Sequence, residues 1–253
     1  MTIEQLSNRP LSYSSIKEFA KSPSHYIKYL TKDRKDTPEL IFGSALHCVL
    51  LTPGSFNDQF IVTDKFDLRK KEDKAKYELV MLEAAAGNKK VLQSDVHDTL
   101  IEITNKVLEN DEFVQILDMA HTIEQKEYLE IFGLPFIRIK DIETDDAIID
   151  IKSTQDASIE SMNKDFFNYQ YYLQAAIYGN NFKFYVVEKN FPYYNGLIDV
   201  SKDWIEYGTN KLERLCIAFN HCLENPECFN QSYDFWYKFE NRKPIISLPG
   251  WAK

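Results

Sequence analysis

The pattern of apolar and polar residues predicts a chain in which helices flank a series of strands. Alternating or continuous apolar runs are typical of strands, and they occur at residues 122–131, 136–139, 147–154, 182–188 and 193–200. Apolar residues at helical spacing instead mark residues 11–22, 23–30, 44–51, 74–86, 94–109, 111–120, 165–179 and 201–224. This mixture predicts an α/β fold with a mixed central sheet flanked by helices.

The two N-terminal helices carry clear boundary signals. Ser12 or Ser14 can cap the first helix, since both hydroxyls precede its apolar residues Ile16 and Phe19. Pro23 is favoured at the first position of a helix and begins the second one.

The most informative stretch is AIIDIKST, residues 147–154. It opens with a short β-branched apolar run, which is typical of a buried strand. Side chains alternate along a strand, so Asp150 and Lys152 share one face while Ile151 points away. A carboxylate and an amine are costly to bury unless they are paired or used. Taken alone, the pair is equally consistent with a structural ion pair at a strand end.

The residues upstream make this pair a candidate metal site. Residues 136–139 predict a strand, residues 143–146 a polar turn, and residue 147 begins the returning strand. Such a hairpin brings Asp141 beside Asp150. Carboxylates hold Mg²⁺, and a lysine such as Lys152 can orient or help deprotonate an attacking water. The three residues therefore indicate metal-assisted phosphodiester hydrolysis.

Composition limits the alternatives. A chain of 253 residues with 44% apolar residues suits one large domain, or a core with a helical annex. The net charge of −9 argues against a basic surface for nucleic acid, although only local charge matters in a cleft and bound metals add positive charge. We expect a cytoplasmic protein, because no apolar run is long enough for a membrane span and no signal peptide opens the chain.

Four cysteines are too few and too scattered for a disulfide framework; they are Cys48, Cys216, Cys222 and Cys228. Cys216 and Cys222 lie six residues apart on a predicted helix and do not share a face, which argues against an iron–sulfur cluster. Buried apolar thiols are the expected state.

Several motifs, in order along the chain, resemble those of the PD-(D/E)xK nucleases. Asp141, Asp150 and Lys152 match the D…(D/E)xK core, and QAAIY at 174–178 matches the Q-x-x-x-Y element of the RecB type. The helix GSALHCVLL is similar to the G-x-A-x-H helix of the exonuclease VIII family and its phage relatives. The tail IISLPGWAK is similar to that family's last residues, whereas Ser22 replaces a cysteine of the RecB type.

The resemblance implies a restriction-endonuclease-like fold and a site. The chain, residues 1–253, would be one nuclease domain, with a helical annex at about 66–120 and a catalytic core at about 121–200. The implied ligands of Mg²⁺, or of Mn²⁺ as a substitute, are His47, Asp141, Asp150 and the Ile151 carbonyl. The implied catalytic residues are Asp141, Asp150, Lys152, Glu127, Gln174 and Tyr178.

Each of the added residues also has a structural interpretation. A histidine among apolar neighbours, such as His47, is more often a core residue than a ligand. Glu127 suits a salt bridge on a strand equally well. Most of the aromatic residues beside Gln174 and Tyr178 suit a helix packed on the sheet.

The implied DNA contacts are less regular. The relatives carry a basic element that corresponds to residues 64–77 here. It implies that Arg69, Lys71 and Lys74 contact the DNA backbone, together with Thr154 from the core. The alternative is that these charged residues form the solvent-exposed start of a helix. The family usually has Lys and Arg four and two residues before the first aspartate. This chain has Ile137 and Ile139 there, so the basic contacts are relocated or the grip on DNA is weaker.

The implied function is a Mg²⁺-dependent exonuclease that degrades linear duplex DNA from the 5′ end and exposes 3′ single strands for recombination. The resemblance also implies a ring of subunits and a single-strand annealing protein as partner. The alternatives are a structure-specific or nicking endonuclease on the same core, and a catalytically silent module that binds DNA or protein, which the acidic charge favours.

Overall fold

A five-stranded mixed sheet forms the centre of the chain. The computed structural model describes residues 2–32, 36–179 and 181–241, so the C-terminal tail motif lies outside the described residues. The strands run in the order β3-β4-β5-β6-β7, in which only β5 and β6 are parallel neighbours. Their bounds are Thr122–Ile131, Leu134–Glu143, Ile148–Thr154, Phe182–Glu188 and Asn195–Asp199. The predicted α/β fold with a mixed sheet is confirmed.

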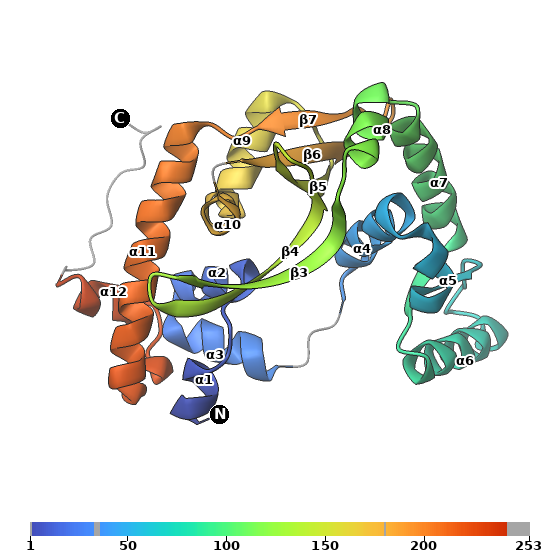
Figure 1. Cartoon of the computed structure of the whole chain (residues 1–253). Coiled ribbons are helices and arrows are strands. Elements are labelled where there is room, and N and C mark those ends of the chain that lie inside the picture. Colours follow the sequence, from blue (N-terminus) through green and yellow to red (C-terminus); the bar gives the residue numbers. More distant parts are fainter. Residues whose placement is uncertain (1, 33–35, 180, 242–253) are drawn as a thin grey trace, which may run out of the picture.

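β3 and β4 form a long curved hairpin whose far end reaches the N-terminal helices (Figure 1). The turn between them consists of Phe132 and Gly133, both at positive φ (49° and 74°), as two-residue hairpin turns require. Leu11 pairs with Phe136 at the outer edge of β4. Leu11 therefore holds the hairpin near its turn, and pairing of Ile142 and Glu143 with β5 holds its other end.

Helices on one side of the sheet enclose the larger core. They are α1 (Ile3–Ser7), α2 (Tyr13–Lys21), α3 (Pro23–Thr31), α9 (Ile159–Asn168), α10 (Tyr171–Tyr178), α11 (Lys202–Glu224) and α12 (Asp234–Phe239), with a 3-10 turn at Pro226–Asn230. α11 lies directly against α10, where a Cβ at Gly208 would come within 2.0 Å of the Tyr172 carbonyl oxygen. A glycine is needed at this close approach.

The second core lies on the other side of the sheet. The elements of this side begin before the annex expected at about 66–120: α4 (Pro38–Leu51), a 3-10 turn (Pro53–Ser55), α5 (Phe56–Gln59), β1 (Phe60–Thr63), α6 (Lys71–Ala86), β2 (Lys90–Gln93), α7 (Ser94–Leu108) and α8 (Asp111–Asp118). Successive residues of β6 alternate between the two cores: Phe184 and Val186 enter the larger one, Tyr185 and Val187 the smaller one. In Figure 1, α4 lies beside the curved hairpin, and α5 to α7 extend beyond it.

The structure corrects two predicted helices and adds two strands. The helix expected at 165–179 is two helices, because Gln170 adopts a left-handed conformation (φ 60°) between α9 and α10. α4 begins at Pro38 rather than Ser44, with Thr37 as its cap. The two parallel four-residue strands β1 and β2 were not predicted, since runs this short carry little periodic signal. Of the two capping alternatives, Ser12 is the N-cap of α2.

Candidate active site

The two predicted carboxylates meet where β4 and β5 separate. The strands pair only at Ile142↔Ile149 and Glu143↔Ile148, after which their ladder stops. Continuing the same register places Asp141 opposite Asp150, and both are buried (6% and 4% exposed). The Asp141 Oδ2 atom accepts a hydrogen bond of 2.8 Å from the backbone N–H of Ile151. Asp141 therefore satisfies a backbone donor that the missing ladder leaves open.

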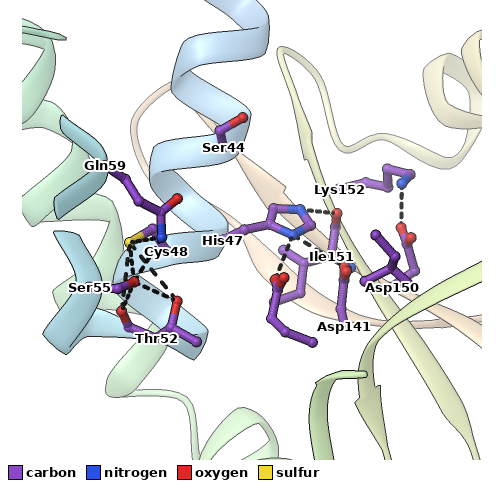
Figure 2. A network of polar contacts seen from close by, with 12 residues as sticks. Ser44, His47, Cys48, Thr52, Ser55, Gln59, Asp141, Asp150, Ile151 and Lys152 are labelled. Atoms are coloured by element: carbon purple, nitrogen blue, oxygen red, sulfur yellow. Dashed lines mark hydrogen bonds and ion pairs between the residues drawn. The ribbon is translucent and has the colours of Figure 1, made fainter. Parts of the chain in front are cut away.

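Asp150, which is buried, and Lys152, which is partly buried, form an ion pair on one face of β5, as the alternation along the strand predicts (Figure 2). The other Asp150 oxygen accepts a hydrogen bond from the Gln174 side-chain amide on α10. Burial raises the pKa of Asp150. Burial alone would lower the pKa of Lys152, but the Asp150 carboxylate raises it above its ordinary value. Lys152 is thus a cation, held in place by Asp150.

His47 reaches the carboxylates from α4. Its Nε2 atom lies 2.9 Å from the Ile151 carbonyl oxygen, and its Nδ1 atom lies 3.3 Å from Asp141 Oδ2 (Figure 2). Burial works against the charged imidazole, but hydrogen bonds to Asp141 and then Glu124 outweigh it and raise the pKa of His47 to about 10. The imidazole therefore contacts the Ile151 carbonyl through Nε2 and the Asp141 carboxylate through Nδ1.

Glu124 belongs to this group, although the sequence analysis did not identify it. Its Oε1 atom lies 3.9 Å from His47 Nδ1, and ligand atoms of His47, Glu124 and Asp141 all lie within 4.8 Å of one another. Glu124 has a positive φ of 55° within β3, a strained conformation that is concentrated at functional sites. Counting back through the Phe132-Gly133 turn pairs Asp141 with position 124, so the hairpin register could have found it.

These groups fit a hard divalent cation. Two carboxylates, one imidazole and one backbone carbonyl form a mainly oxygen donor set, which suits Mg²⁺ or Mn²⁺ better than a soft, thiolate-preferring metal. Asp150 lies beside this cluster rather than within it, because Lys152 and Gln174 hold its oxygens.

Glu127 lies elsewhere. The Arg138 Nε atom donates a hydrogen bond of 2.7 Å to Glu127 Oε2, and Lys140 Nζ lies 3.3 Å from the same oxygen. Glu127 is not among the residues that line the cleft in the described part of the chain. The surroundings of Glu127 are those of a salt bridge on a strand. The glutamate of β3 that lies near His47 and Asp141 is Glu124.

Tyr178 positions the backbone of β4. Its hydroxyl donates to the Ile139 carbonyl oxygen (2.6 Å) and accepts from the Ile139 N–H (3.2 Å). Arg138 in turn donates to the carbonyl oxygens of Ile177 (3.1 Å) and Tyr178 (2.7 Å) at the end of α10. These bonds tie α10 to the strand that carries Asp141.

A cleft of about 1150 Å³ opens onto the site. It is lined by eight of the site residues that the resemblance implies: His47, Asp141, Asp150, Ile151, Lys152, Thr154, Gln174 and Tyr178. Its basic residues are Lys17, Lys90, Arg138, Lys152 and Lys189, and it also contains Ile137 and Ile139. Among the residues described, Arg69, Lys71 and Lys74 do not line it, and the largely exposed Arg69 pairs with Asp67.

The four cysteines are reduced and buried, as expected. Cys48 follows His47 on α4 but points to Ser55, whose Oγ lies 3.4 Å from its Sγ atom (Figure 2). No helix in the described ranges is long and apolar enough to cross a membrane.

Comparison with known proteins identifies the family. A family model described as "PDDEXK-like domain of unknown function (DUF3799)" matches residues 12–231. No curated protein matches the sequence. A crystal structure of a "Putative exonuclease" from Eubacterium rectale is similar, with 13% identity and a TM-score of 0.61 over 98% of this chain and 93% of that chain; at this identity the likeness shows the fold. The family match supports a nuclease in general. The chain belongs to the PDDEXK-like family DUF3799.

Proposed function

We propose that the chain is a Mg²⁺-dependent DNA exonuclease. The observation that carries this proposal is the convergence of Asp141, Asp150 and Lys152 with His47 in one cleft. Asp141, Glu124, His47 and the Ile151 carbonyl would hold the metal, with Asp150 adjacent. Mn²⁺ would substitute for Mg²⁺, since the donor set includes an imidazole. When bound, the metal supplies Lewis-acid stabilisation of the charge that develops on the phosphate and acidifies its water.

The chain's own residues would orient the attacking water. Lys152 is a partly buried cation that donates hydrogen bonds, so it would hold a water or hydroxide in line with the phosphate and stabilise negative charge there. Asp150 fixes the direction of the Lys152 side chain, and Gln174 fixes Asp150. Tyr178 would act indirectly, because its hydroxyl positions the backbone of β4, the strand that carries Asp141.

Lysines of the cleft would supply the grip on DNA. Lys17, Lys90 and Lys189 line the cleft, where the two isoleucines replace the family's usual basic residues. Thr154 lies at the same wall, and Arg69, Lys71 and Lys74 would contact only a duplex that extends beyond the cleft. Because affinity grows with the number of phosphates neutralised, a single chain of net charge −9 would hold DNA weakly, which favours a ring of subunits around the duplex.

The finer assignment rests on resemblance. The similarity to the exonuclease VIII family favours 5′-to-3′ degradation of linear duplex DNA, with 3′ single strands as product for recombination. A single-strand annealing protein would then take up that product, in the cytoplasm. The structural neighbour described as a "Putative exonuclease" agrees with attack at ends.

The test compares end-labelled linear duplex with closed circular DNA, in Mg²⁺ and in EDTA. The proposal predicts loss of nucleotides from the 5′ ends of linear DNA in Mg²⁺ only, and intact circles. Nicking of circles would indicate an endonuclease on the same core. Binding without cleavage under all conditions would indicate a catalytically silent module.

A further inference from the structure

A glycine in the middle of α4 has no explanation within the fold. Gly43 is the sixth residue of the helix Pro38–Leu51, and glycine in a helix interior is less favourable than alanine. Its φ is not positive, and a Cβ built on it meets no atom of the described residues within 4 Å. At Gly208, by contrast, a Cβ would collide with Tyr172. Neither backbone conformation nor packing therefore requires a glycine at position 43.

Gly43 lies on the face of α4 that lines the active-site cleft. Glu39, Leu40, Gly43, Ser44 and His47 all line it, at the spacing of one helical face. Gly43 precedes the proposed metal ligand His47 by one turn. The helix is consequently bare at the point where the cleft wall meets the site.

The surroundings of this bare surface suit a phosphate backbone. The Lys90 Nζ atom donates a hydrogen bond of 2.8 Å to the hydroxyl of Ser44, the residue after Gly43. This places a positive charge beside the bare turn, although Asp36, 3.6 Å from Lys90, offsets part of it. A polyanionic strand is attracted to such a site and can approach the helix most closely where no side chain intervenes.

We propose that Gly43 is a clearance point, where the sugar–phosphate backbone of the bound DNA strand passes against α4 on its way to the metal site. This inference rests on the proposed function and adds a residue that sets the width of the cleft. Glycine at this position lowers the stability of the helix but leaves space beside His47.

The test is a series at position 43 with a matched control. Gly43→Ala and Gly43→Leu add increasing volume to the cleft wall. Gly54→Ala is the control. In the described part of the chain, a Cβ at Gly54 also meets nothing within 4 Å, but Gly54 does not line the cleft. Thermal melting, binding of a labelled DNA duplex in EDTA, and kcat and KM in Mg²⁺ are measured for each variant.

The proposal predicts opposite changes in stability and binding. Gly43→Ala raises Tm by about 2 °C, because alanine is more favourable than glycine in a helix interior, and it weakens DNA binding. Gly43→Leu weakens DNA binding by about tenfold or more, and in the kinetics it raises KM more than it lowers kcat. Gly54→Ala leaves binding unchanged.

Two results overturn the inference. One is unchanged DNA affinity across the Gly43 series in a parent protein that cleaves DNA. The other is a lower Tm for Gly43→Ala, which would mean that the fold itself requires the glycine. Failure of the parent to hydrolyse any DNA in Mg²⁺ would reject the proposed function instead, which separates the two failures.

Discussion

Metal binding at this site should release a proton from His47. The carboxylates beside it raise the pKa of His47 to about 10, so the imidazole holds its proton at neutral pH in the metal-free protein. A metal ligand must be neutral imidazole. The cation therefore has to displace this proton before His47 can coordinate it.

The size of the effect follows from the pKa. With a pKa of about 10, about one molecule in a thousand carries neutral His47 at pH 7, which costs metal binding about 4 kcal/mol. Because the pKa of His47 lies above neutral pH, raising the pH removes the proton that competes with the metal. The apparent metal affinity therefore rises by about tenfold per pH unit and levels off near this pKa. About one proton is released per metal bound.

Calorimetric titration of Mn²⁺ in buffers of different ionisation enthalpy measures both quantities. His47→Gln should bind the metal more weakly and lose the pH dependence that this proton causes. His121→Gln is the matched control, because His121 is half exposed and lies beside the turn residue Asp145 rather than in the cleft. A parent protein that binds Mn²⁺ without proton release, with affinity constant from pH 7 to pH 9, would refute the reasoning.

Three further variants and one solution measurement test other parts of the account. Lys152→Met should lower turnover about 100-fold or more while the protein stays folded and binds metal by calorimetry; a variant keeping a tenth of the parent rate would exclude the role of Lys152. Lys17→Met should weaken DNA binding. The control Lys21→Met should not, because Lys21 pairs with Glu18 and does not line the cleft in the described part of the chain. Arg138→Ala should destabilise the chain by about 3 kcal/mol in urea unfolding, because two helix-end carbonyls lose their donor; a loss below 1 kcal/mol would contradict this. Light scattering should show a closed oligomer, and a monomer at micromolar concentration would remove the proposed ring.

The core strands and their polar ends could be predicted because the signals are local. β3 begins and ends at the predicted residues. The alternation in β5 correctly placed Asp150 and Lys152 on one face and Ile151 on the other. A buried strand with two charged residues at its end is easy to recognise in a sequence. Because the turn before it is short, the two strands of the hairpin can pair in only a few registers.

Features that depend on tertiary contacts could not be predicted in the same way. The helix break at Gln170 lies at a left-handed residue that no Gly or Pro marks in the sequence. The choice between Glu124 and Glu127 depended on the hairpin register, which the resemblance did not supply. The basic residues that line the cleft come from α2, β2, β4, β5 and the loop after β6, whereas the dense basic stretch near Arg69 is local and lies outside it. Charge density along a sequence does not report charge density in space.

The assignment of the metal site to the hairpin ends is tested most directly by separating Asp141 from the aspartates of the turn. Asp141 is buried and held by Ile151, whereas the side chain of Asp145 is 97% exposed and the Asp146 N–H bonds to Thr144 within the turn. The measurement is Mg²⁺-dependent nucleotide release from 5′-labelled linear duplex DNA. Asp141→Asn should abolish release, and the double variant Asp145→Asn, Asp146→Asn should retain most of it. An active Asp141→Asn protein beside an inactive double variant would contradict the site.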